Sequence, residues 1–144
     1  MSVNILLADY HLMVREGLKQ VLELDHDIDV ISEASDGYEC LNLINKTHPD
    51  LVLLDINMPN LDGLQVLSIM KQQKMKSKVI MLTIHKDVDY LIEALDAGCD
   101  GYVLKDSDSE TLKKAIFDVY NGETFIEPSL TVLLNSSLAE RDVM

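Results

Sequence analysis

The chain has 144 residues, 47% of them hydrophobic, which suits one globular domain and leaves no room for a second of ordinary size. Lys and Arg number 12 against 25 Asp and Glu, so the formal net charge is −13 and these residues repel the phosphate backbone of a nucleic acid. Apolar runs stay far below the ~18 residues of a membrane helix and the first residues lack the pattern of a signal peptide, so we expect a cytoplasmic protein that does not contact membranes.

The first part of the chain predicts two pairs of strand and helix. Residues 3–8 form a short apolar strand that ends at Asp9, and residues 12–24 carry apolar side chains at the spacing of an amphipathic helix. Residues 28–34 predict a second strand. The helix after it stops before Pro49, because the residue that precedes a proline resists the helical conformation.

The third strand, residues 51–54, consists of four consecutive apolar residues that run directly into Asp55. Such a run indicates a strand buried on both faces. Asp55 is therefore expected at the carboxyl end of a central strand, which is where open α/β sheets bind their ligands. Asp55 could instead only cap the following turn through its own backbone. The groups at the ends of the other strands decide between these interpretations.

The second part of the chain repeats the alternation. Strands at 79–82 and 101–104 end at Thr83 and Lys105, and amphipathic helices lie before, between and after them. Five strands that alternate with five helices predict an α/β fold with a doubly wound parallel sheet and helices on both faces. For five strands the flavodoxin-like order 2-1-3-4-5 is the common solution.

That strand order brings polar groups from four strands to one edge of the sheet. Asp9 and Asp55 become neighbours and, beside the carbonyl of Asn57, make an all-oxygen site of the kind that Mg²⁺ selects. A phosphoryl group could approach Asp55 there and form an aspartyl phosphate, with Lys105 and Thr83 contacting its oxygens. Taken singly, Lys105 is explained as a solvated lysine and Thr83 as an ordinary strand residue. Taken jointly, the groups favour a phosphoryl site.

On these residues the chain resembles a response-regulator receiver domain, and its details resemble the NarL/FixJ (LuxR-type) subfamily of two-component transcriptional regulators. The resemblance covers nearly everything from Ile5 to Pro128 and implies the CheY-like form of the flavodoxin-like fold. The motifs that carry it are Leu-Leu-Ala-Asp9, Val14-Arg-Glu-Gly-Leu18, Glu33-Ala-Ser-Asp-Gly37, Asp50-Leu-Val-Leu-Leu-Asp55-Ile-Asn-Met-Pro59, Asp62-Gly63, Leu82-Thr83, Ala97-Gly98 and Gly101-Tyr-Val-Leu-Lys-Asp106.

The resemblance implies a receiver that takes a phosphoryl group from a histidine kinase onto Asp55 and thereby switches a transcription-regulating output. Asp9, Asp55 and Asn57 would surround Mg²⁺, and Lys105 would contact the phosphate. Such a domain is a phosphoacceptor that assists the transfer and hydrolysis of its own phosphoryl group, and it is not an enzyme in the usual sense.

The resemblance also implies that Thr83 and Tyr102 form a switch pair. Bound phosphate would draw Thr83 inward and let Tyr102 turn in behind it. The simpler interpretation of Tyr102 is a half-buried strand aromatic. Ile84 departs from the small residue that usually follows the switch threonine, so it should narrow access to Asp55 and prolong the life of an acyl phosphate.

Tyr10 departs from the family pattern at the second of two acids that usually follow the first strand. A phenol is a poor Mg²⁺ ligand at neutral pH because its pKa lies near ~10. We therefore expect weakened Mg²⁺ binding and slow or absent phosphorylation compared with a receiver that holds both acids. Tyr10 is also the reason to keep an alternative function, an atypical receiver that acts through partners or ligands without phosphorylation.

The resemblance divides the chain into a receiver at residues 1–122 and a linker-like tail at residues 123–144. In the subfamily a helix-turn-helix DNA-binding domain follows such a tail, and this chain lacks one. The chain is thus interpreted as a truncated piece or as a receiver that acts alone. Any contact with DNA would come through the absent output domain, and homodimerisation on phosphorylation is a further expectation.

A competing function from the enzyme class is a phosphohydrolase that forms an aspartyl phosphate. Those enzymes carry Asp-x-Asp, with the second Asp as acid and base, whereas this chain has Asn57, whose amide cannot transfer that proton. The four histidines show no spacing typical of a metal site and are expected at the surface or at caps. The sequence leaves open the kinase, its signal, the target genes and the oligomeric state.

Overall fold

The computed structural model describes residues 2–143, and it describes side chains for residues 2–136. Strands and helices alternate along this part of the chain. They are β1 (Val3–Ala8), α1 (Leu12–Glu23), β2 (Ile28–Ala34), α2 (Gly37–Thr47), β3 (Leu51–Leu54), α3 (Gly63–Gln72), β4 (Lys78–Thr83), α4 (Val88–Asp96), β5 (Gly101–Leu104), α5 (Ser109–Tyr120), β6 (Phe125–Ile126) and α6 (Pro128–Val143).

The sheet is parallel throughout and has the order β2-β1-β3-β4-β5-β6. The predicted order of the first five strands is therefore confirmed. The prediction of five strands was wrong in number, because β6 adds a sixth at the edge beside β5. β6 has only two residues, Phe125 and Ile126, and so short a strand gives no alternation that a sequence pattern could reveal.

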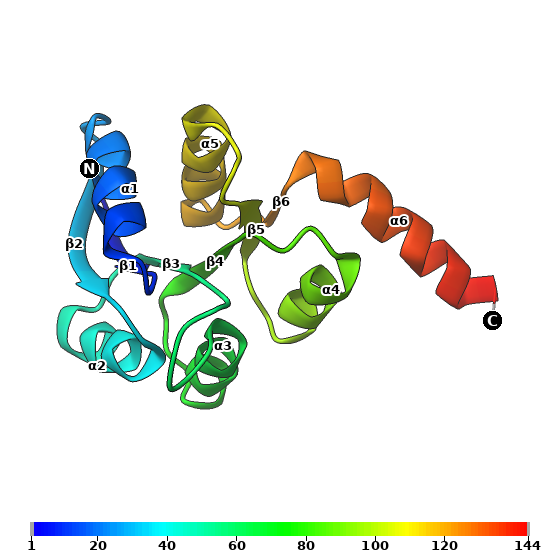
Figure 1. The fold of residues 1–144 in the computed structure, drawn as a ribbon, viewed down its shortest axis with the longest axis horizontal. Helices are drawn as coiled ribbons and strands as arrows, with labels where there is room; N and C mark the ends of the chain where they lie inside the picture. The colour runs from blue at the N-terminus through cyan, green and yellow to red at the C-terminus, as the bar shows by residue number, and fades with distance from the viewer. Residues whose placement is uncertain (1, 144) are drawn as a thin grey trace.

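Helices cover both faces of the sheet, and each face has its own apolar core. In Figure 1, α1 and α5 lie on one side of the sheet and α2, α3 and α4 on the other. Alternate residues of one strand point into different cores, as the pleat requires. Ile5 and Leu7 pack with Leu22 of α1 and Ile116 of α5, whereas Leu6 belongs to the core under α2, α3 and α4.

The segment that follows α5 joins this body. β6 pairs with β5, and Leu130 and Leu134 of α6 are buried in the same core as residues of α4. The sequence had assigned residues 123–144 to a linker-like tail, whose last residue, Met144, lies outside the described part of the chain. The structure thus gives the first turns of that tail a fixed place beside α4 (Figure 1).

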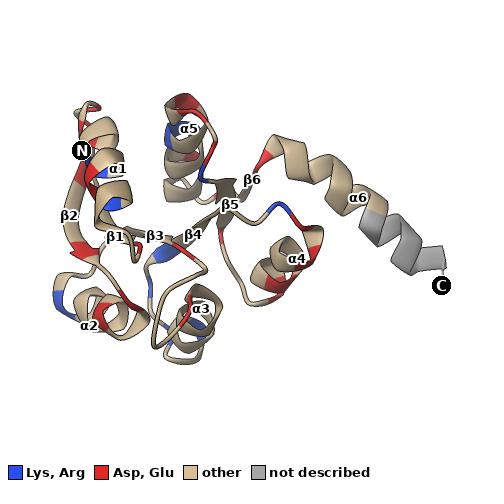
Figure 2. Ribbon diagram, in the orientation of Figure 1, with Lys and Arg blue, Asp and Glu red and all other residues tan. Residues whose placement is uncertain are grey.

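Acidic residues are spread over the loops and helices around the sheet, and basic residues are fewer (Figure 2). Among the described residues, no helix is both long enough and apolar enough to cross a membrane.

Candidate functional site

Three strand ends of the sheet position the groups of the site through their backbone. The amide of Asp9 donates to the carbonyl of Ala34, and the amide of Asp55 donates to the carbonyl of Ala8, each extending the strand ladder by one residue. The amide of Lys105 likewise donates to the carbonyl of Thr83 at 2.8 Å. The side chains that follow β1, β3 and β5 therefore leave the sheet at one edge, as the strand order predicted.

Lys105 joins the two carboxylates. Its Nζ lies 2.6 Å from Oδ2 of Asp9 and 3.1 Å from Oδ2 of Asp55. Asp9 is 1% exposed and Asp55 is 4% exposed, so both charges lie almost entirely out of water. Two buried carboxylates so close together need a compensating cation, and the ammonium of Lys105 supplies it.

The charges of the cluster shift the pKa values of its members unequally. Burial raises the pKa of the Asp55 carboxyl, the charge of Lys105 opposes this shift, and the charge of Asp9 adds to it. Burial alone would lower the pKa of the Lys105 ammonium, but its hydrogen bond to Asp9 and the charge of Asp55 outweigh burial and raise that pKa. Lys105 is thus a cation at neutral pH, and its charge offsets the effect of burial on the pKa of Asp55 only in part.

The loop between β3 and α3 holds Asp55 in a fixed orientation. The amide of Asn57 donates to Oδ1 of Asp55 at 3.2 Å, and the amide of Gly63 donates to the carbonyl of Ile56. A Cβ at Gly63 would lie 2.1 Å from the carbonyl oxygen of Asp55, so only glycine permits this approach. Asp62 caps α3 by accepting from the amide of Gln65, which completes the turn.

The predicted switch residues lie on the paired strands β4 and β5, and both contact the backbone of His85. Thr83 is fully buried at the end of β4, and its Oγ1 accepts a hydrogen bond from the amide of His85. Tyr102 is also fully buried, and its hydroxyl donates to the carbonyl of His85 at 3.1 Å. Tyr102 is thus not the half-buried aromatic of the simpler interpretation. Burial is the main reason that the pKa of its phenol is raised.

His85 is a residue that the sequence reasoning assigned to the surface without a role. Its Nε2 lies 2.9 Å from Oδ1 of Asn57, and its ring stacks on Tyr90 with the centroids 4.0 Å apart. His85 therefore links the loop after Asp55 to the loop after Thr83. The two loops are 28 residues apart along the chain, and no motif spacing signals this contact.

His11 lies at a cap, as the sequence predicted for the histidines, since it is the N-cap residue of α1, and it also contacts the site. Its amide donates to Oδ1 of Asp9 at 2.8 Å, and its Nδ1 lies 3.4 Å from the same oxygen. Tyr10, between them, is 55% exposed, and its ring lies edge-on to the ring of His11. The phenol thus faces solvent to a large degree and does not seal the carboxylates.

Ile84 lies at the mouth of the site. It is 65% exposed and lines, with Lys86, Lys105 and Asp106, an open cavity of about 380 Å³. Lys86 and Asp106 form an exposed ion pair at 2.9 Å across this cavity. A branched side chain at this position therefore borders one approach to Lys105.

The donor chemistry of the site fits a magnesium ion held by few charged ligands. Two carboxylates and a backbone carbonyl are hard oxygen ligands, and a cation, Lys105, already lies between Asp9 and Asp55. Within the described residues no group of three or more His, Cys, Asp or Glu side chains is arranged to hold a metal. Asp9 and Asp55 would thus be the only charged protein ligands, and Asn57 would add its carbonyl.

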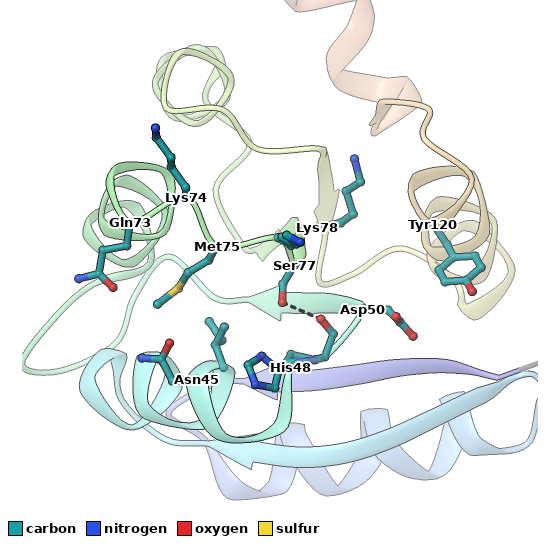
Figure 3. A pocket seen from close by; sticks show the side chains of 12 residues that line it. Asn45, His48, Asp50, Gln73, Lys74, Met75, Ser77, Lys78 and Tyr120 are labelled. Atoms are coloured by element: carbon teal, nitrogen blue, oxygen red, sulfur yellow. Dashed lines mark hydrogen bonds between the residues drawn. The ribbon is translucent and has the colours of Figure 1, made fainter.

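A cavity of about 700 Å³ lies elsewhere. Figure 3 shows it between the ends of α2 and α3, lined by Asn45, His48 and Met75 among others. It lies at the edge of the sheet where β3 and β4 begin, opposite to Asp55. Ser77 is satisfied there by donating to the carbonyl of Pro49 at 2.6 Å. Its lining brings no nucleophile beside a base, so the carboxylate edge remains the candidate site.

Comparisons with known proteins agree with this geometry. A family model described as "Response regulator receiver domain" matches residues 5–117. The chain is 37% identical over 146 residues to the nitrate/nitrite response regulator protein NarL of Escherichia coli (strain K12), a match that covers 97% of this chain and 68% of that protein. The chain also matches the nitrate/nitrite response regulator protein NarP of Escherichia coli (strain K12) at 38% identity, over 78% of this chain and 53% of that protein.

Two solved structures have the same fold. The signal receiver domain of the putative response regulator NarL from Mycobacterium tuberculosis is 34% identical with a TM-score of 0.82, and the match covers 85% of this chain and 98% of that one. A two-component response regulator of the LuxR family from Aurantimonas sp. SI85-9A1 is 29% identical with a TM-score of 0.90, and the match covers 100% of both chains.

Proposed function

Because this chain belongs to the family of response regulator receiver domains, within the NarL and LuxR-type group of two-component regulators, we propose that Asp55 is its phosphoacceptor and that a histidine kinase is the donor. The observation that carries the proposal is the cluster of Asp9, Asp55 and Lys105, in which one ammonium contacts both buried carboxylates. This assembly offers an ionised oxygen nucleophile beside a fixed cation.

The transfer is a displacement at phosphorus. An oxygen of the Asp55 carboxylate forms the new bond to phosphorus, and the bond from phosphorus to the donor's imidazole nitrogen breaks. The electron pair of the broken bond stays on that nitrogen, and the imidazole takes up one proton from solvent to leave in its neutral form. Lys105 stabilises the charge on a phosphoryl oxygen, and Thr83 donates its hydroxyl to another. Thr83 and Lys105 follow neighbouring strands, and the amide of Lys105 donates to the carbonyl of Thr83.

Asp9, Asp55 and the carbonyl of Asn57 are the residues that we propose as ligands of Mg²⁺. When bound, a divalent cation supplies charge neutralisation for the transferring group. Tyr10 leaves the site with one acidic ligand fewer than the family pattern, so we expect binding weaker than in a receiver with both acids.

We propose that the conformational change on phosphorylation is transmitted from Thr83 to Tyr102 through the loop that contains His85. Thr83 accepts from the amide of His85 and Tyr102 donates to its carbonyl, so this one residue contacts both switch side chains. Once the Thr83 hydroxyl turns to a phosphoryl oxygen, the amide of His85 loses its acceptor. The loop then rearranges near β4, β5 and α4, and that surface is where an output domain or a second copy of the chain would sense the change.

The alternative of a receiver without phosphorylation rests on Tyr10 alone, and no contact of Tyr10 favours it. The phosphohydrolase is not favoured either, because Asn57 presents an exposed amide bound to His85 where such an enzyme needs an acid.

Phosphorylation with a small donor tests the proposal. The chain is incubated with acetyl phosphate and Mg²⁺, and its intact mass is measured for the parent, for Asp55→Asn and for Asp106→Asn. Asp106 is a matched control because it is an exposed acid next to Lys105. We expect one phosphate on the parent and on Asp106→Asn, and none on Asp55→Asn. An adduct that persists in Asp55→Asn, or a parent that is never modified, contradicts the proposal.

A further inference from the structure

Glu127 is a buried acid for which the proposed phosphoryl chemistry has no use. It is 8% exposed and lies at the junction between β6 and α6. Its Oε2 accepts a hydrogen bond from the amide of Leu104 at 3.2 Å, and its Oε1 accepts one from the hydroxyl of Ser107 at 2.5 Å. A buried carboxylate needs such hydrogen-bond donors, because its removal from water is otherwise unfavourable.

The two donors lie on either side of Lys105. Leu104 is the last residue of β5, and Ser107 lies in the turn that leads to α5, with its amide donating to the carbonyl of Leu104. The side chain of Glu127 thus contacts the loop that presents Lys105 to Asp55 at both of its ends. A shift of Lys105 toward a phosphoryl oxygen would displace Leu104 and Ser107, the two residues that donate to the carboxylate of Glu127.

The backbone of Glu127 makes the connection to α6. Its amide donates to the carbonyl of Tyr102 at 2.8 Å, which fixes it to the switch strand. Its carbonyl accepts from the amides of Leu130 and Thr131, and so it begins the hydrogen bonding of α6. Pro128, the first residue of the helix, has no amide proton to satisfy. One residue therefore contacts β5, the Lys105 loop and the first turn of α6.

The residue type at this position is itself informative. A helix is usually capped by Ser, Thr, Asp or Asn, whose short side chain bonds to the helix's own amides. Glu127 occupies that place but directs its longer side chain away from α6, to the loop between β5 and α5. Among the ion pairs of the described side chains none includes Glu127, so the amide of Leu104 and the hydroxyl of Ser107 are the partners that its carboxylate has there. Glu127 thus holds the position of the loop through its carboxylate and the start of α6 through its backbone carbonyl.

We propose that Glu127 is a positioning residue that couples the Lys105 loop to α6, so that a phosphoryl group at Asp55 and the packing of α6 on α4 change each other's equilibrium. The inference rests on the proposed function of Asp55. Coupling of this kind is reciprocal, so either site reports on the other.

Hydrogen exchange of the whole chain tests the coupling. Amide exchange in residues 130–136 is measured with and without Mg²⁺ and beryllofluoride, a phosphoryl analogue, and bound fluoride is followed separately by ¹⁹F NMR. In the parent we expect beryllofluoride to change exchange in this segment about fivefold or more. In Glu127→Ala, beryllofluoride still binds and the change in residues 130–136 is lost.

Two variants separate coupling from simple stability. Glu127→Gln should keep the effect, because its amide can accept from Leu104 and donate to the Ser107 oxygen. Glu123→Ala, which removes an exposed acid in the preceding turn, should behave as the parent. Ser107→Ala removes one of the two donors without altering Glu127, so it should reduce the effect and provides the same test if Glu127→Ala does not fold.

The outcomes distinguish this inference from the proposed function. If the parent binds no beryllofluoride, the proposed function fails and the coupling fails with it. If beryllofluoride binds, and Glu127→Ala or Ser107→Ala shows the same change in residues 130–136 as the parent, only the coupling is overturned.

Discussion

Lys105 sets the charge balance of the candidate site. Asp9 and Asp55 bring two negative charges and Lys105 one positive charge, so the buried cluster carries a net charge of −1. A divalent cation would turn this to +1, which suits an incoming phosphoryl dianion. Without that cation, Asp55 and a phosphoryl group repel each other. The residues of the cluster therefore make transfer dependent on the metal.

Asp55→Asn should stabilise the fold at neutral pH while it abolishes phosphorylation. Burial raises the pKa of Asp55, so the folded chain holds this proton more tightly than the unfolded chain. This tighter proton binding contributes to the free energy of unfolding. The contribution is complete below the pKa of Asp55 in the unfolded chain, ~3.9, and is lost as pH rises through the pKa of Asp55 in the folded chain. At pH 7 the asparagine should gain about 1 kcal/mol in the free energy of unfolding, measured with urea. The gain should shrink toward pH 4, and a gain that is constant with pH would refute the argument.

Tyr10→Asp should restore an acid next to Asp9 and tighten Mg²⁺ binding about tenfold in a calorimetric titration. Tyr38→Asp is the matched control, because Tyr38 is 61% exposed on α2 and its replacement adds the same charge at a residue that does not adjoin Asp9 in the chain. Equal affinities in the parent and in Tyr10→Asp would show that the phenol is not what weakens the site.

Ile84→Ala should shorten the life of the aspartyl phosphate. Ile84 lines the cavity that opens beside Lys105, and its removal admits water more easily. We expect dephosphorylation to become about threefold faster, a change worth about 0.7 kcal/mol in the barrier. The decay is followed by intact mass after removal of the donor, and an unchanged rate excludes this role.

At the scale of the element, the loop between β3 and α3 has the least tolerance for change. Gly63→Ala would place a methyl group 2.1 Å from the carbonyl oxygen of Asp55 and force β3 and α3 apart. We expect a loss of about 3 kcal/mol in the free energy of unfolding. Gly17→Ala is the control, because nothing lies within 4 Å of its Cβ and alanine favours the interior of α1, by about 1 kcal/mol. Similar effects of the two changes would contradict the close approach.

The sequence predicted those strands and helices in which the pattern of apolar side chains within the element itself indicates which faces are buried. Residues 51–54 are apolar without interruption because β3 is covered on both faces, and the strand order then brought Asp9 toward Asp55. The contacts of His85 and Glu127 could not be predicted in this way. Each connects loops 20 or more residues apart, through one polar side chain whose direction depends on tertiary packing.

At the scale of the whole molecule, the question is whether α6 unfolds together with the sheet. Leu130 is 2% exposed in the core beneath α4, whereas Val132, two residues away, is 69% exposed. If α6 belongs to the cooperative unit, Leu130→Ala should lower the free energy of unfolding by about 2–3 kcal/mol within a single transition. Val132→Ala should change it by less than about 0.5 kcal/mol. Equal stability of the two variants would mean that α6 docks too weakly to report on the site, and the sheet with its first five helices would then fold without it.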